Sequence, residues 1–181
     1  AKYFVKVQDL DELKEAIKFS QEKNINYFIL GGGSNILVSD DGYDGIVIKL
    51  DGKFKDIYFD TSSKSITVGA GVLLPHFVKK CMDKGISGFD YLSLISGTIG
   101  AAVCINAGTK KGEIKNSFLG CEVLSDSEII KLQKDDLAFS YRNSKLKNSQ
   151  DLVLNATFEY ESLKSSEEIL KNIKEYRLDR K

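Results

Sequence analysis

The 181 residues of this chain are enough for a domain with a substantial buried core. Lys and Arg total 26, as do Asp and Glu, so the net charge is zero and favours neither nucleic acid nor a membrane surface as partner. No apolar run approaches the ~20 residues of a membrane-spanning helix, and the first ten residues lack a signal-peptide pattern. We therefore expect a cytoplasmic monomer that binds neither nucleic acid nor membrane.

The strand signals of the first fifty residues are apolar runs at Tyr3–Val7, Asn26–Leu30, Ile36–Val38 and Ile46–Leu50. After the first run, Asp9 and Glu12 have the capping-box spacing and predict a helix over residues 9–23. Three glycines follow Leu30 and end the second run abruptly, and a turn at Asp40–Gly42 separates the last two. This pattern predicts a β-α-β unit with a glycine loop at its exit.

Strands are also expected later in the chain, at Ile57–Asp60, Ser65–Gly69, Phe118–Leu124, Ile129–Leu132 and Leu152–Tyr160. Pro75 suits the first position of a helix that ends near Gly85. A capping box formed by Ser165 and Glu168 opens a last amphipathic helix. We therefore predict an α+β fold, with a small lobe over residues 1–70 or so and a larger lobe, with an antiparallel sheet and helices, after it.

The sharpest local feature is the run LGGGSNILV at Leu30–Val38. Three glycines between strands let the backbone approach a ligand closely, and successive N–H groups can hold phosphate oxygens. Ser34 and Asn35 add side-chain donors. The alternative is a tight turn that binds nothing. A P-loop would need Gly-Lys-Ser/Thr here, and a dinucleotide fingerprint would need a helix after its glycines, so neither motif fits.

Two further segments carry candidate chemistry. Ser96–Ala102 (SGTIGAA), continued by Asn106-Ala107-Gly108, suits a chain lying against a flat ring, although a helix packed closely on a neighbour would have the same composition. Phe139–Ser144 (FSYRNS) sets an arginine among aromatic and hydroxyl residues, where its planar fork can hold a carboxylate or phosphate. A plain surface arginine is the alternative for that segment.

No metal site is expected. Cys81, Cys104 and Cys121 form no CxxC pair, and His76 is the single histidine. The cysteines are typical of buried thiols in a reducing compartment.

Taken in order, Gly31–Asn35, Ser96–Gly108 and Tyr141–Ser144 resemble the UDP-N-acetylenolpyruvoylglucosamine reductases. That family's pattern is a GGGSN loop, a segment like GxPGTxGGAxxxNAG, and a YRxS element. The match VGAG at Val68–Gly71 extends the resemblance to nearly the whole chain. Each motif is weak alone, but the ordered set is specific. The resemblance implies one FAD-binding domain of the vanillyl-alcohol-oxidase (PCMH) type over residues 1–181, without the C-terminal substrate domain.

The chain departs from the family pattern at two places in the second motif. It has Ser96 where the family usually has proline, and Gly100-Ala101 where the family has a glycine pair. A larger departure is that the family's serine proton donor and late glutamate belong to a domain expected beyond Lys181. We therefore expect the isolated chain to be inactive.

The resemblance also implies roles for individual residues. FAD would be held noncovalently by Gly31, Gly32, Gly33, Ser34, Asn35, Ile36, Leu37, Ser96, Gly97, Thr98, Gly100, Ala101, Ala102, Asn106, Ala107 and Gly108. Arg142 would be the catalytic residue that faces the enolpyruvyl carboxylate, and Tyr141 would help to place the substrate or Arg142. NADPH would reduce the flavin, which would then reduce UDP-N-acetylglucosamine enolpyruvate in peptidoglycan synthesis.

Other interpretations stay open at this point. The chain fits another noncovalent FAD oxidoreductase of the same domain type, acting on an alcohol or a sugar lactone. It also fits a flavin-binding module without catalysis.

Overall fold

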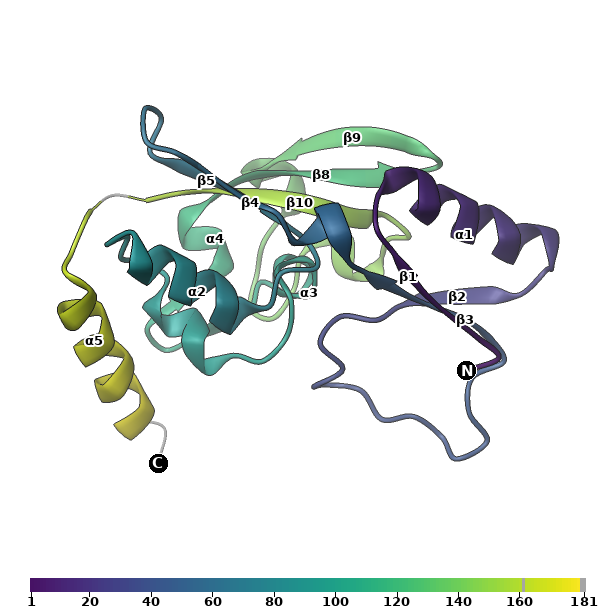
Figure 1. The fold of residues 1–181 in the computed structure, drawn as a ribbon, viewed down its shortest axis with the longest axis horizontal. Helices are drawn as coiled ribbons and strands as arrows, with labels where there is room; N and C mark the ends of the chain where they lie inside the picture. The colour runs from purple at the N-terminus through teal and green to yellow at the C-terminus, as the bar shows by residue number, and fades with distance from the viewer. Residues whose placement is uncertain (161, 180–181) are drawn as a thin grey trace.

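The structure, a computed structural model, describes residues 1–160 and 162–179. Its fold is built on two main β-sheets (Figure 1). The first sheet is parallel and has the order β1 (Tyr3–Val7), β3 (Gly45–Leu50), β2 (Asn26–Ile29). Helix α1 (Leu10–Glu22) connects β1 to β2 and buries Leu13 and Ala16. Asp9 caps the helix as expected, because its carboxylate accepts hydrogen bonds from the backbone N–H groups of Asp11 and Glu12. The Glu12 carboxylate accepts from Gln8 N and not from Asp9 N, so the reciprocal bond of a capping box is not formed.

The second sheet is antiparallel, in the order β4 (Ile57–Asp60), β5 (Ser65–Gly69), β10 (Leu152–Glu159), β8 (Phe118–Ser125), β9 (Glu128–Gln133). All these strands confirm the sequence prediction. Since β4 and β5 belong to this sheet, the chain passes from one sheet to the other between Leu50 and Ile57, earlier than the lobe boundary expected near residue 70.

The strand predicted at Ile36–Val38 is wrong. These residues lie in the long loop between β2 and β3, where Leu37 is fully exposed (Figure 1). The central strand β3 is already paired on both sides by β1 and β2. The outer edge of β2 is free, but none of the described pairings joins residues 36–38 to it.

Helices α2 (Leu74–Asp83), α3 (Ile99–Cys104) and α4 (Ile114–Ser117) lie beside the five-stranded sheet (Figure 1). Pro75 lies in the first turn of α2, as predicted. The last helix, α5 (Ser166–Leu178), has the predicted capping box of Ser165 and Glu168. The side-chain amide of Asn172 in α5 donates to the buried Asp90 carboxylate over 2.9 Å, which attaches the helix to the domain.

Short elements complete the chain: η1 (Gly52–Lys55), η2 (Asp90–Leu94), β6 (Gly108–Thr109), β7 (Gly112–Glu113), η3 (Lys134–Leu137) and η4 (Lys145–Asn148). Within the described residues, no helix is both long enough and apolar enough to span a bilayer.

Four phenylalanine rings form the centre of the larger core. Phe77, Phe89, Phe118 and Phe158 are each at most 1 % exposed, and they come from α2, the segment before η2, β8 and β10. The Phe158 ring centroid lies 5.8–5.9 Å from the centroids of the other three. This cluster joins the five-stranded sheet to the helices beside it.

We expect Phe158→Ala to lower the free energy of unfolding by about 3–5 kcal/mol, because it removes buried surface and leaves a cavity among three rings. Phe4→Ala is the control, since the Phe4 side chain is 55 % exposed, and it should change the free energy much less. Urea titration of both variants measures the difference, and equal losses would contradict the central role of the cluster.

Candidate functional site

Two glycine segments that are far apart in sequence touch each other. A Cβ atom placed on Gly32 would lie 3.2 Å from Gly97 Cα, and one on Gly31 would lie 3.1 Å from Thr98 Oγ1. The second segment is fixed by hydrogen bonds that Leu74 N donates to Gly97 O and Ile99 N donates to Val72 O. The glycines therefore allow an approach of the two backbones that larger side chains would obstruct.

Two cavities of about 320 and 210 Å³ lie at this contact and share the lining residues Gly31, Gly32, Thr98 and Ala101. Most of the predicted flavin residues line one or both: Gly31, Gly32, Gly33, Ser34, Asn35, Ile36, Ser96, Gly97, Thr98, Gly100, Ala101, Ala102 and Ala107. The structure thus brings the GGGSN loop and the SGTIGAA segment together, as a shared ligand requires. Leu37 lies outside both cavities, and its assignment to FAD stays a prediction.

The lining of these cavities suits a flavin dinucleotide. None of the backbone N–H groups of residues 31–35 donates a hydrogen bond to another described residue, so they are available to phosphate oxygens. Gly33 has a φ of +70° and Gly97 a φ of +128°, both in the region that favours glycine. Small side chains such as Ala101 and Ala102 leave room for a flat ring.

Cys104 is a residue that sequence spacing did not connect with the glycine loop. It lines the 320 Å³ cavity together with Gly31 and Gly32, although it is distant along the chain. Burial raises the pKa of the Cys104 thiol to about 11, which keeps it protonated and weakly nucleophilic at neutral pH. Cys104 is partly exposed, whereas Cys81 and Cys121 are buried as predicted. Lys49 and Lys55 also line this cavity, and no motif had singled them out.

A third cavity, of about 950 Å³, contains the other predicted residues. Tyr141 and Arg142 line it with Asn106 and Gly108, so those last two lie apart from the cavities of the glycine loop. Tyr141 and Arg142 form a two-residue turn, closed by hydrogen bonds between the backbones of Ser140 and Asn143. Arg142 has a φ of +53°, which is uncommon for a bulky residue.

The cavity of the arginine turn is rich in charge. Lys110, Lys111, Glu113 and Asp179 line it, and Lys111 Nζ lies 2.9 Å from an Asp179 carboxylate oxygen. Hydrogen bonds from Lys115 and Asn106 and the nearby charge of Arg142 lower the pKa of Glu113, so that it is ionised at neutral pH. In the part of the chain that the structure describes, no three His, Cys, Asp or Glu side chains gather as metal ligands would.

The fold and the cavities define a domain that binds a flavin dinucleotide. The profile of the FAD-binding domain family matches residues 1–133. At the level of the fold, 6-hydroxy-D-nicotine oxidase from Arthrobacter nicotinovorans is similar, with a TM-score of 0.61 over 87 % of this chain and 36 % of that protein, at 16 % identity. The α+β fold of the PCMH type is therefore confirmed.

More specific similarities follow. The UDP-N-acetylenolpyruvoylglucosamine reductase of Caldicellulosiruptor saccharolyticus is 41 % identical over 162 residues, which cover 87 % of this chain and 50 % of that protein. The crystal structure of the Thermus caldophilus reductase gives a TM-score of 0.79 at 33 % identity, covering 98 % of this chain and 62 % of the other. The chain therefore belongs to the FAD-binding domain family, and it is similar to part of these reductases. It spans about half the length of the curated relatives it matches.

A matched pair of variants tests the glycine loop. Gly33 and Gly42 both have positive φ angles, and a Cβ would meet no atom closer than 3.9 Å at the first and none within 4 Å at the second. Alanine at either position should cost about 1–2 kcal/mol of backbone strain. Because Gly33 lines a flavin cavity and Gly42 does not, only Gly33→Ala should weaken FAD binding, by about tenfold.

Titration of the apo-protein with FAD, beside a urea melt, separates the two costs. If Gly33→Ala binds FAD as tightly as Gly42→Ala does, the glycine loop is a turn without a ligand.

The high pKa of Cys104 bears on how FAD is attached. We expect noncovalent FAD, because a protonated thiol is a poor nucleophile and no histidine lines the two flavin cavities. Acid precipitation of the purified protein should release the yellow colour into the supernatant. Colour in the pellet would show a covalent link, and its loss in Cys104→Ala would identify the attachment.

Proposed function

We propose that this chain is the FAD-binding part of an NADPH-dependent enzyme that reduces UDP-N-acetylglucosamine enolpyruvate to UDP-N-acetylmuramate in peptidoglycan synthesis. The observation that carries the proposal is the place of the Tyr141–Arg142 turn. The turn lines a large cavity whose cationic lining residues are Lys110, Lys111 and Arg142 itself. Asn106 and Gly108, which also line this cavity, follow directly in sequence on the segment expected to hold the flavin. The names of the relatives described above support the same activity.

The link between the two kinds of cavity is the short helix α3. Gly97 and Thr98, just before it, line the flavin cavity, and Asn106, just after it, lines the cavity of the arginine turn. Six helical residues span roughly 9 Å. A flavin and a substrate bound at the two ends of this segment would therefore occupy neighbouring sites, and both ligands would have to extend along α3 for their reacting atoms to meet.

In this mechanism bound FAD supplies the hydride, and the residues of this chain bind and orient. The Arg142 guanidinium presents a planar fork to the enolpyruvyl carboxylate and stabilises the negative charge that develops there as hydride arrives. No described residue lies within ion-pair distance of Arg142, so the fork is available. Tyr141, which is 84 % exposed, offers a ring against which the substrate can pack.

Lys110 and Lys111 also line this cavity, which suits a substrate that carries a diphosphate. We further infer that the protein works as a cytoplasmic monomer without nucleic-acid or membrane partners. The balanced net charge supports the absence of a polyanionic partner.

The test is a chimera in which this chain replaces the matched half of the Caldicellulosiruptor saccharolyticus reductase. In it, Arg142→Ala should lower the rate of hydride transfer from reduced flavin to substrate by about 10²–10³-fold, because a preorganised charge partner is lost. Reduction of FAD by NADPH should change much less.

Stopped-flow measurement separates these two half-reactions. Arg177→Ala is the control, because Arg177 is an exposed arginine of α5 that lines none of the three cavities. An unaltered rate of hydride transfer in Arg142→Ala would remove Arg142 from the site.

A further inference from the structure

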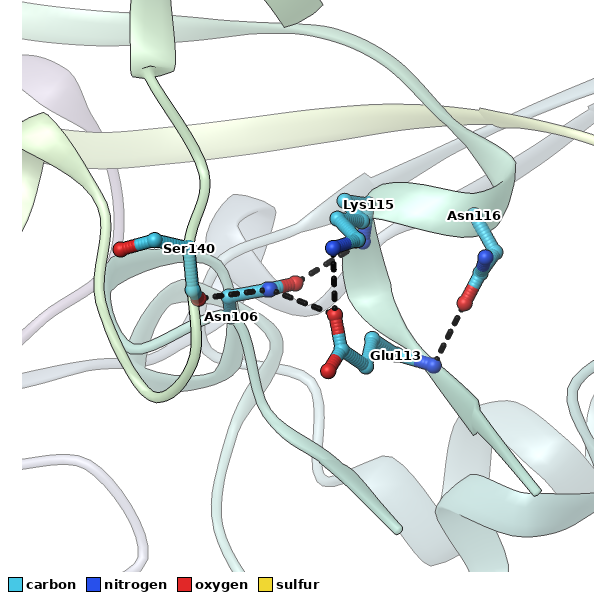
Figure 2. Close-up of polar contacts among 5 residues, drawn as sticks. All are labelled: Asn106, Glu113, Lys115, Asn116 and Ser140. Atoms are coloured by element: carbon cyan, nitrogen blue, oxygen red, sulfur yellow. Dashed lines mark hydrogen bonds and ion pairs between the residues drawn. The ribbon is translucent and has the colours of Figure 1, made fainter. Parts of the chain in front are cut away.

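The Asn106 side chain lines the cavity of the arginine turn and neither cavity of the glycine loop, although its motif had implied a flavin contact. It is 1 % exposed and engages three groups of the chain itself (Figure 2). Its amide nitrogen donates to Ser140 O and to the Glu113 carboxylate, each over 3.0 Å. Its amide oxygen accepts from Lys115 N, also over 3.0 Å. Both amide hydrogens are therefore used, and none is left for a cofactor.

We propose that Asn106 is a positioning residue that acts through Arg142. It holds the turn that carries Arg142, and it holds Glu113 away from the guanidinium that has to receive the substrate carboxylate. This inference rests on the proposed function of Arg142 as the carboxylate partner.

The first half of the proposal concerns the base of the turn. Ser140 O accepts a hydrogen bond from Asn143 N, which closes the turn, and a second from Asn106, which attaches the turn to the end of α3. The buried Ser144 hydroxyl donates to Cys104 O over 2.7 Å and makes a second attachment there. These anchors hold Arg142 in its left-handed conformation, which a free turn would tend to leave.

The second half concerns Glu113. One carboxylate oxygen of Glu113 accepts from Asn106 and lies 3.0 Å from Lys115 Nζ (Figure 2). Glu113 is close enough to Arg142 to sense its charge but does not form an ion pair with it. Without Asn106, Glu113 loses one of the contacts that fix its carboxylate and keeps those with Lys115 and the Asn116 backbone N–H, so it can turn more readily toward Arg142. It would then compete with the carboxylate of the substrate.

A purely structural role would be the simpler account, because Asn106 has a φ of +44° and asparagine tolerates that conformation. Asn106→Gly separates the two roles, since glycine adopts a positive φ without strain but offers no amide. Asn155→Ala is the matched control. Its amide also donates to a glutamate, Glu122, over 2.7 Å, but it lies on the five-stranded sheet and lines none of the three cavities described above.

Hydrogen exchange on the chain itself tests the anchor without any substrate. In Asn106→Gly the amides of Ser140 and Asn143, which close the turn, should exchange about tenfold faster or more. In Asn155→Ala they should exchange at the rate of the unaltered protein. Unchanged exchange in Asn106→Gly would overturn the claim that Asn106 holds the turn.

Kinetics in the chimera test the action through Arg142. Asn106→Gly should lower the kcat/KM for substrate reduction by about 10–10²-fold and leave flavin reduction by NADPH unchanged. Combined with Arg142→Ala, it should cause little further loss, because both changes remove one function. Adding Glu113→Gln to Asn106→Gly should restore part of the activity, since the competing charge is gone.

Fully additive losses, or no recovery with Glu113→Gln, would overturn the role in positioning. If Arg142→Ala itself has no effect, the proposed function of Arg142 fails, while the exchange data still decide whether Asn106 holds the turn.

Discussion

The arrangement of this domain depends on the contact between the backbones of Gly32 and Gly97. No side chain stands between them, and a Cβ on Gly32 would already lie 3.2 Å from Gly97 Cα. At this contact, the loop that follows β2 of the parallel sheet packs on the residues just before α3. Helix α3 itself lies beside the antiparallel sheet. The two cavities of about 320 and 210 Å³ lie at this contact and share Gly31, Gly32, Thr98 and Ala101 as lining residues, because neither segment fills the space next to it.

The small residues of α3 follow from the same constraint. A Cβ on Gly100 would meet the Ala70 Cβ at 3.0 Å, so this side of the helix lies directly against the end of β5. The opposite requirement holds at Ala101, which is exposed and lines both flavin cavities. On one face of α3, Gly100 has no side chain because β5 ends close by. On another face, the small side chain of Ala101 leaves the cavities open for the proposed flavin. The two alternatives given for the composition of Ser96–Ala102, a chain lying against a flat ring and a helix packed closely on a neighbour, are therefore compatible.

Local signals predicted most elements of this fold. The Asp9 and Ser165 caps, the strand alternation and Pro75 depend on neighbours in sequence, and the structure confirms them. The strand predicted at Ile36–Val38 failed because an apolar run does not reveal whether its backbone will pair with a neighbouring strand. The passage to the second sheet after Leu50 and the place of Cys104 beside the glycine loop depend on distant contacts too. The motifs named residues that line the three cavities, but they did not show which of these use their polar atoms on the chain itself.

The polar residues near the arginine turn show why that distinction matters. Asn106 and Arg142 both adopt left-handed backbone conformations, which cost free energy and persist where the surrounding structure determines them. Asn106, Ser144 and Glu113 use their polar atoms on the chain itself, while Arg142 has no ion-pair partner among the described residues. The hydrogen-bonded residues offset the strain at Arg142, and in the proposed function they hold its charged fork ready for the substrate. Preorganisation of this kind lets a single guanidinium stabilise developing charge with little rearrangement, and under the same proposal it gives an asparagine without ligand contact a share in the effect of the arginine it supports.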